Sequence, residues 1–296
     1  MKPTIGIIGV GLMGHGIARN ILKRGYKLTA MEHPGNRPLD ELLSLGAATR
    51  DNAADVARES DVLILCVTGS PEVEAILTGE QGALVGLRPG AIVVDCSTAI
   101  PGSTIRMAAK VEARGGRFVD APMTRTAQHA HEGKLNLLVG GAAETVEEVR
   151  PVLACFAENI EAVGGIGAGH KMKLLHNFVS IGFMSLLAEA AACAERAEVS
   201  AEAFVKVLAS GGGGGVALDR LKPYILSRDV TLQFSISNAL KDINYYREMA
   251  RETHSAREIA DALCATYLGA VEAGAGRKMV PELIAFLAEN GEATGR

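Results

Sequence analysis

A glycine-rich turn near the N-terminus constrains the fold of this chain more than any other feature. An apolar run over residues 4–8 leads directly into Gly9-Val-Gly11-Leu-Met-Gly14, and a helical pattern follows to residue 24. In this context the first glycine permits a tight turn and the second lets the backbone approach a pyrophosphate. The third lets the helix pack closely on the strand. The spacing therefore predicts a dinucleotide-binding unit rather than a purely structural glycine turn.

The predicted cofactor contacts extend past the glycines into the next loop. Glu32 stands 18 positions after Gly14, where an acidic side chain would accept hydrogen bonds from the adenosine ribose hydroxyls and favour NAD. Asn36 and Arg37 follow, and they would bind a 2′-phosphate if Glu32 turned away, so both NAD and NADP stay open. The predicted cofactor-binding residues of this region are Gly9, Gly11, Leu12, Met13, Gly14, Glu32 and Arg37.

The first half of the chain alternates strand and helix patterns, whereas the second half is helical. Strands are predicted over 4–8, 27–31, 62–67, 91–95, 117–119 and 136–139, with helices over 14–24, 53–59, 72–77, 103–114 and 143–156. This alternation is typical of a parallel sheet built from βαβ units. Helices are then predicted over 170–197, 200–209, 217–227, 236–252, 255–274 and 280–289. We expect an α/β fold with a Rossmann-type dinucleotide-binding domain over 1–164. A long inter-domain helix would then lead into an all-helical substrate and dimerisation domain over 165–296.

Composition excludes several other classes of protein. With 296 residues, 48% of them hydrophobic, the chain can bury a large core, and its net charge of −4 gives no reason to expect a nucleic-acid partner. The five cysteines stand far apart, which predicts reduced, buried thiols in a cytoplasmic protein without a signal peptide. The apolar run over 178–194 contains Glu189 and predicts a buried inter-domain helix rather than a membrane span. Five glycines at 211–215 predict a loop, either a flexible connector or a backbone nest for an anion.

The helical pattern that begins near residue 168 carries the candidate chemistry. Leu174, Phe178 and Ile181 recur at helical spacing and predict an apolar stripe. Lys173 and Asn177 stand four residues apart, so their side chains would lie one turn apart on one helix face. Such a pair could protonate and orient a substrate oxygen. The alternative is a solvated lysine and asparagine on an ordinary helix.

Several ordered blocks together resemble the β-hydroxyacid dehydrogenases, which include the 3-hydroxyisobutyrate dehydrogenases. Besides the glycine turn, these blocks are Asp95-Cys-Ser-Thr98 with Pro101, Asp120-Ala-Pro122, Gly133-Lys-Leu135 with Gly140-Gly141, Gly167-Ala-Gly169 with Lys173 and Asn177, and Phe234 with Lys241-Asp242. The resemblance runs nearly end to end. It implies a Rossmann-type domain, a long helix, a 6-phosphogluconate dehydrogenase-like helical domain, and a homodimer or homotetramer.

The resemblance also implies roles for individual residues. Lys173 matches the family's catalytic lysine and Asn177 its substrate-orienting asparagine. A lysine can act as acid or base when burial or a nearby cation lowers its pKa, and Lys241 could supply that cation. The residues implied to contact the cofactor here are Val67, Thr68, Thr98 and Lys241.

The chain departs from the family where a substrate carboxylate is usually held. After Asp-Ala-Pro the family has a hydroxyl and two glycines, whereas this chain has Met123 followed by Thr124, Arg125 and Thr126. We predict that these three residues bind an anionic substrate and that Arg125 clamps its carboxylate, phosphonate, phosphate or sulfonate. The alternative for Arg125 is an ordinary surface residue. A second departure is His176, which is either a donor at the border of the pocket or an ordinary helix-face histidine, the reading that we favour.

His129-Ala-His131 lacks the helical spacing of metal ligands, so no metal site is predicted.

Three functions remain in consideration for this chain. The leading function is hydride transfer between NAD or NADP and a small anionic β-hydroxy acid, or the matching semialdehyde or ketone. An imine reductase of the same architecture is disfavoured by the intact Lys173. A non-catalytic nucleotide-binding regulator is disfavoured by the Lys173 and Asn177 pair.

Overall fold

The computed structural model describes residues 2–290 and divides into two compact units. The division falls within helix α9 (Ala168–Arg196), between Lys173 and Leu174. The domain boundary predicted between residues 164 and 165 stays a prediction. Each unit is described below by itself.

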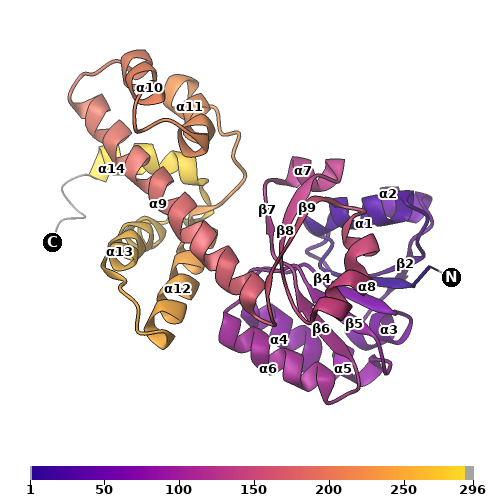
Figure 1. Ribbon diagram of the computed structural model, residues 1–296. Helices are drawn as coiled ribbons and strands as arrows, with labels where there is room; N and C mark the ends of the chain where they lie inside the picture. Colours follow the sequence, from indigo (N-terminus) through magenta and orange to yellow (C-terminus); the bar gives the residue numbers. More distant parts are fainter. Residues whose placement is uncertain (1, 291–296) are drawn as a thin grey trace. The chain divides into compact units, whose positions relative to one another are not determined.

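The first unit is built on a twisted, mostly parallel sheet (Figure 1). Its parallel part has the strand order β3-β2-β1-β4-β5-β6, which is the order of a Rossmann-type sheet. The strands are β1 (Ile5–Ile8), β2 (Leu28–Met31), β3 (Ala48–Arg50), β4 (Val62–Leu65), β5 (Ile92–Asp95), β6 (Arg117–Asp120), β7 (Met123–Thr124), β8 (Leu135–Gly140) and β9 (Ala157–Gly164). The predicted dinucleotide-binding fold is therefore confirmed.

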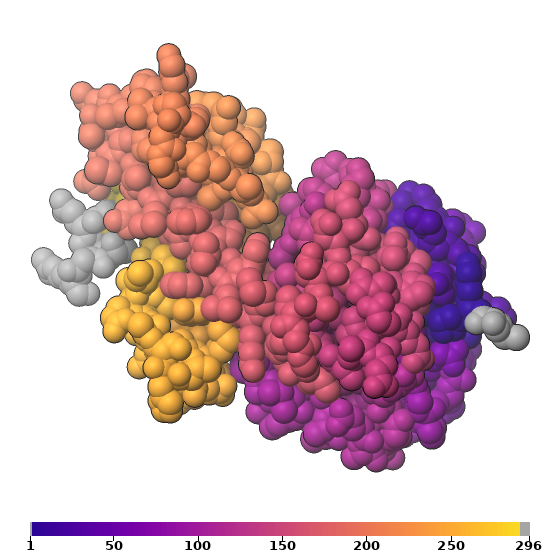
Figure 2. Space-filling model, viewed as in Figure 1, coloured from indigo at the N-terminus to yellow at the C-terminus, as the bar shows by residue number. Residues whose placement is uncertain are grey.

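Helices cover both faces of this sheet because successive strand residues point to opposite sides. Ile7 and Val94 pack in one buried cluster with residues of α1 and α8, whereas Ile8 and Val93 pack in another with residues of α3 and α6. The helices of this unit are α1 (Gly14–Lys23), α2 (Asp40–Ser44), α3 (Ala53–Arg58), α4 (Ser70–Thr78), α5 (Ala83–Gly86), α6 (Pro101–Glu112), α7 (Ala127–Glu132) and α8 (Ala143–Leu153). In the space-filling view the indigo N-terminal segments form one side of the unit (Figure 2).

The sheet that was predicted to be parallel also contains antiparallel pairing at one end. β8 runs antiparallel to β6 and β7, and β9 pairs with β8 in parallel. β3, β7 and β9 were not predicted from the sequence. β3 and β7 have three residues or fewer. β9 exposes Glu158 and Glu161, so its sequence lacks the apolar pattern by which a strand is recognised.

The second unit is all-helical in its described residues, as predicted. Besides most of α9 it contains α10 (Ala201–Ala209), α11 (Val216–Ser227), α12 (Ile236–Glu252), α13 (Glu258–Glu272), α14 (Leu283–Asn290) and the short 3-10 helices η1 (Ala275–Arg277) and η2 (Val280–Glu282). Their buried apolar side chains form one core. Within this unit, α10 and α11 lie at one end and α12 and α13 at the other (Figures 1 and 2). Residues 211–215 form the predicted loop between α10 and α11.

Helix α9 carries two apolar faces. The predicted stripe is confirmed, since Leu174 and Ile181 are buried and Phe178 stacks on Tyr246 with ring centroids 4.1 Å apart. A second stripe is exposed, with Val179 at 51% and Phe183 at 57% of their full accessibility. The helix is long and apolar enough to cross a membrane by length and composition, and 44% of its most apolar window is buried. The prediction of a buried helix is therefore wrong for this face.

The cysteines are free thiols, but not all of them are buried. Cys96, Cys155 and Cys264 are buried, Cys66 is partly exposed, and Cys193 lies exposed on α9. The prediction of burial is wrong for Cys193 because the helix turns that position away from the core of the second unit.

Candidate active site

The first unit brings several predicted site residues to one edge of its sheet. β1, β4, β5 and β6 are parallel, and Ile8, Leu65, Asp95 and Asp120 are in register across them. The segments that follow these strands therefore leave from a common carboxyl edge, where ligands bind in open α/β sheets. They contain the glycine turn, Val67 and Thr68, Thr98, and the segment from Met123 to Thr126.

The glycine turn has the geometry of a pyrophosphate cradle. Gly9 has φ +96°, and a Cβ there would overlap the carbonyl oxygen of Cys66. A Cβ on Gly14, the first residue of α1, would overlap the carbonyl oxygen of Gly9. By contrast, a Cβ on Gly11 would meet no heavy atom within 4 Å. No side chain caps α1, so its N-terminal amides and the bare backbone at Gly11 suit an anionic cofactor.

An open hollow of about 630 Å³ lies where the adenosine end of a dinucleotide is expected. Glu32 and Arg37 line it and are exposed. Asn36 is engaged within the loop, because its amide accepts from the Val10 N–H at 3.3 Å and donates to the Met31 carbonyl at 2.8 Å. Both residues considered for a 2′-phosphate, Asn36 and Arg37, line the hollow, and the Asn36 amide is the one held by hydrogen bonds within the loop.

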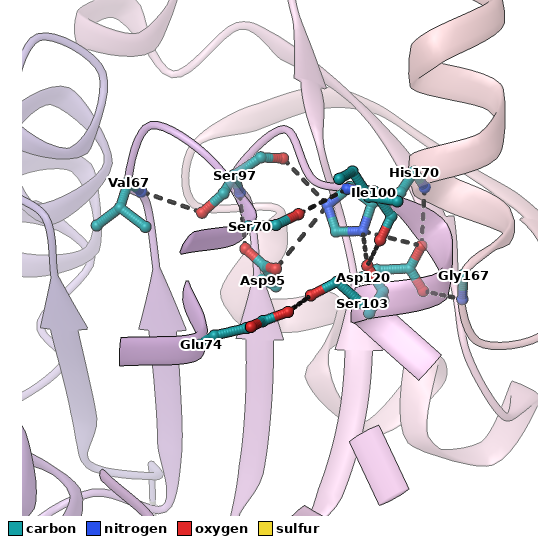
Figure 3. Close-up of polar contacts among 11 residues, drawn as sticks. Val67, Ser70, Glu74, Asp95, Ser97, Ile100, Ser103, Asp120, Gly167 and His170 are labelled. Carbon is teal, nitrogen blue, oxygen red and sulfur yellow. Dashed lines mark hydrogen bonds and ion pairs between the residues drawn. The ribbon is translucent and has the colours of Figure 1, made fainter. Parts of the chain in front are cut away.

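The turns after β4 and β5 are hydrogen-bonded to each other (Figure 3). The Ser97 hydroxyl accepts from the Val67 N–H at 3.1 Å, and the Ser97 N–H donates to Asp95 at 2.9 Å. The predicted cofactor contacts at Val67 and Thr98 therefore belong to two neighbouring turns that are hydrogen-bonded to each other.

Lys173 and the predicted anion-binding residues lie near β7. The Lys173 amine donates to the Met123 carbonyl at 2.7 Å. The Thr124 hydroxyl accepts from Asn136 at 3.2 Å, and the Thr126 hydroxyl lies 2.8 Å from the Nδ1 atom of His129. These contacts fix the segment immediately beside the lysine.

Arg125 adopts a backbone conformation that favours glycine. Its φ is +79°, a region in which a side chain is strained. Its Nη1 atom donates to the Glu158 carboxylate at 2.5 Å and also to the Lys134 carbonyl. Its role as a substrate clamp stays a prediction, and any substrate anion must compete with Glu158 for that nitrogen.

In the second unit the predicted polar residues converge on Asp242. Asn177 donates to one Asp242 oxygen at 2.6 Å, and the Lys241 amine lies 3.0 Å from the other. Asn177 and Asp242 are 8% and 4% exposed, so their hydrogen bond is buried, whereas the Lys241 side chain is 21% exposed. His176 lies 2.9 Å from the Asn177 oxygen through its Nδ1 atom. These residues form one connected polar group within this unit.

A buried carboxylate without a role predicted from the sequence caps the start of α9. Asp120 accepts from the Gly167 N–H at 2.7 Å and from the His170 N–H at 2.8 Å (Figure 3). Burial raises the pKa of Asp120, and His170 and the two backbone donors partly offset that effect. One signal was present in the sequence, since Asp95 and Asp120 each end a short apolar run, where a carboxylate reaches the carboxyl edge of a sheet. The charge partner His170 lies 50 residues further on and had no such signal.

Within residues 2–290, no group of three or more histidine, cysteine or acidic side chains is placed to hold a metal ion.

The doubly wound sheet, the pyrophosphate cradle and the helical second unit together define an NAD(P)-dependent oxidoreductase. Residues 4–165 match the NAD-binding domain of 6-phosphogluconate dehydrogenase. Residues 167–287 match the NAD-binding domain of NADP-dependent 3-hydroxyisobutyrate dehydrogenase.

Comparison with individual proteins agrees with these matches. The chain is 32% identical over 276 residues to the 3-sulfolactaldehyde reductase of Escherichia coli K12, covering 93% of this chain and 92% of the relative. It is 31% identical over 247 residues to the 2-hydroxy-3-oxopropionate reductase of the same organism, covering 83% and 84%. The fold matches the Mycobacterium tuberculosis 3-hydroxyisobutyrate dehydrogenase with a TM-score of 0.86 at 24% identity, covering 97% and 99%. The chain therefore belongs to the β-hydroxyacid dehydrogenase family.

Proposed function

We propose that this enzyme interconverts the hydroxyl and carbonyl groups of a small anionic β-hydroxy acid and its semialdehyde or ketone, with Lys173 as the acid/base. The observation that carries the proposal is the position of the Lys173 amine, held 2.7 Å from the Met123 carbonyl in the unit that contains the pyrophosphate cradle. Family membership and the intact lysine support a dehydrogenase over an imine reductase of the same architecture.

The chemistry divides between the cofactor and the protein. A bound nicotinamide supplies or accepts the hydride at the substrate carbon. In the oxidative direction neutral Lys173 takes the hydroxyl proton on its Nζ atom, and in the reductive direction the ammonium returns that proton to the carbonyl oxygen. Met123 holds the amine in place through its carbonyl group. Asn177 orients the substrate oxygen, and Asp242 fixes the Asn177 amide at 2.6 Å.

We assign the substrate's anionic group to the segment Thr124-Arg125-Thr126. A guanidinium can bind a carboxylate, phosphonate, phosphate or sulfonate through two parallel hydrogen bonds. The relatives named for 3-sulfolactaldehyde and 2-hydroxy-3-oxopropionate support a small substrate of this charge class. Arg125 is 27% exposed and already paired with Glu158. The substrate anion would therefore exchange with a carboxylate that the protein itself provides.

A second copy of the chain is the partner we propose for the exposed apolar stripe of α9. Leu175, Val179, Phe183 and Leu186 recur every three or four residues and are 44%, 51%, 57% and 67% exposed. A stripe of this kind on one helix is typical of self-association. A cytoplasmic homodimer or homotetramer fits this surface better than a membrane or a nucleic acid.

A substrate panel tests the proposed function. Purified enzyme would be assayed with hydroxy acids, hydroxy phosphonates and hydroxy sulfonates, and with the matching aldehydes, using NAD(H) and NADP(H) in parallel. We expect turnover of at least one small anionic β-hydroxy acid and none of its neutral ester or amide. Turnover of neutral substrates or imines alone would contradict the proposal. Cofactor binding without turnover across the whole panel would instead support a regulatory nucleotide-binding protein.

A further inference from the structure

Three ionisable side chains lie fully buried together beside the start of α9. Asp95, Asp120 and His170 are each 0% exposed. The aspartates end neighbouring strands in register, and the His170 ring lies between their carboxylates (Figure 3). The Nε2 atom is 3.9 Å from an Asp95 oxygen and the Nδ1 atom is 3.7 Å from an Asp120 oxygen. The proposed reaction uses none of the three.

Hydrogen bonds engage both nitrogens of the His170 ring. Nε2 lies 3.1 Å from the Ser97 carbonyl, which can only accept, so Nε2 must donate. Nδ1 lies 2.8 Å from the Thr104 hydroxyl, and that hydroxyl donates to the Ile100 carbonyl at 3.3 Å. The hydroxyl proton has two acceptors within reach, the Ile100 carbonyl and a neutral Nδ1, and the Thr104 oxygen accepts from Nδ1 when its proton is on Ile100. In that arrangement both nitrogens donate and the ring is an imidazolium, the form that two buried carboxylates within 4 Å of the ring favour.

The surroundings supply the negative charge that an imidazolium needs. Asp95 accepts from the Ser97 N–H with one oxygen, while its other oxygen is buried without a hydrogen bond and faces Nε2. The thiols nearest Asp95 stay neutral, because burial raises the pKa of Cys66 to about 12 and that of Cys96 well above its ordinary value. Within residues 2–290, the ion-pair contacts of both aspartates are with His170, which is charged when its ring is protonated.

We infer that Asp95, His170 and Asp120 form a buried charge triad in which the His170 imidazolium positions Lys173, a role that rests on the proposed function of that lysine. Through Ser97 the ring holds the turn that precedes Thr98, and through Thr104 it holds α6. Its own backbone amide belongs to the first turn of α9, three residues before Lys173.

Asp120 connects this triad to the amine itself. Its carboxylate caps α9, and three residues further along the chain the Met123 carbonyl accepts from the Lys173 Nζ atom. The start of the helix and the end of the lysine side chain are thus anchored on one short segment. Because reacting groups must be held closely in place, a shift of about 1 Å here can cost about a hundredfold in rate.

Nuclear magnetic resonance tests the triad without reference to any substrate. In protein labelled with ¹⁵N at its histidine rings, His170→Gln identifies the His170 signals among the seven histidines. At pH 8, where exposed histidines are neutral, we expect both His170 nitrogens in the imidazolium shift range. A neutral-tautomer pattern at pH 8 would overturn the triad whether or not the enzyme acts on the proposed substrates.

Kinetics of paired variants test the positioning role. We expect His170→Gln to lower kcat by about tenfold or more, with the KM for cofactor changed by less than about twofold. Adding Asp95→Asn to His170→Gln should restore much of kcat, because neither position 95 nor position 170 is then charged. The amide oxygen at position 95 can still accept from the Ser97 N–H. Adding Asp120→Asn to His170→Gln should not restore kcat, because both Asp120 oxygens already accept from backbone N–H groups, those of Gly167 and His170. Equal kcat in wild type and His170→Gln, or equal rescue by the two aspartate substitutions, would overturn the role.

Discussion

Substituting two glycines of the same turn should separate folding from cofactor binding. Gly14→Ala places a methyl group on the carbonyl oxygen of Gly9, and Gly11→Ala places one where no atom lies within 4 Å. Because the first methyl group overlaps a backbone oxygen, which cannot rotate away as a side chain can, α1 and the end of β1 must move apart. The second methyl group points to the space in which we place the pyrophosphate.

The size of each effect follows from these contacts. Overpacking of this kind costs about 1–3 kcal/mol, and each 1 kcal/mol lowers the Tm of a domain this large by about 2–4 °C. Gly11 is outside the left-handed region, so alanine there should leave stability unchanged or raise it by about 0.4–1 kcal/mol. Loss of close approach to the pyrophosphate should weaken cofactor binding at least about tenfold, which is about 1.4 kcal/mol.

Thermal unfolding without cofactor and calorimetric titration with NADH and NADPH measure the two effects. Gly212→Ala, in the loop before α11 and also without a neighbour within 4 Å, is the matched control. We expect Gly14→Ala to melt early and Gly11→Ala to melt normally but to bind cofactor poorly. Wild-type affinity for both cofactors in Gly11→Ala would refute the cradle.

Three further outcomes follow from other contacts. Arg125→Ala should raise the KM for the anionic substrate about tenfold or more, and Glu158→Gln should lower it by releasing the guanidinium from its ion pair, as steady-state kinetics would show. The clamp requires that the two substitutions change this KM in opposite directions, and an unchanged KM in both variants would contradict the proposed role of Arg125. Phe183→Lys on the exposed stripe should shift the mass in light scattering toward the monomer, whereas an unchanged mass would place the interface elsewhere. Asp120 has a raised pKa when folded, so urea unfolding should show wild type gaining stability over Asp120→Asn as pH falls through that pKa. The gain is about 1.4 kcal/mol for each unit of the shift, and a loss over the same range would contradict its burial.

The parts of the fold that follow a local pattern could be predicted from the sequence. β1 with α1, and the long helix carrying Leu174 and Ile181, have the apolar periodicities of buried elements. β9 lacks such a pattern, because its exposed edge carries Glu158 and Glu161, and it forms by pairing with β8. The formation of β9 therefore depends on long-range strand pairing, which a local sequence pattern does not reveal.

The candidate site likewise contains residues that stand in local motifs and residues that come together only in the folded chain. The glycine turn and Lys173 stand in motifs that can be read along the chain. The setting of Arg125 could not be read, because its partner Glu158 lies 33 residues away and its positive φ appears only in the folded backbone. The sequence also gave no reason to link His170 with Asp95 and Asp120, which approach it because their strands end at the same edge.

The role of Lys173 decides whether this chemistry is correctly assigned, and one comparison tests it directly. Lys173→Ala and the exposed neighbour Lys171→Ala, on the same helix, would be measured for kcat and for cofactor Kd on a substrate found in the panel. If Lys173 is the acid/base, its loss should lower kcat by about 10²–10⁴ while Kd stays within about twofold, and Lys171→Ala should match wild type. Near-normal kcat in Lys173→Ala, or loss of cofactor binding in its place, would contradict the assignment.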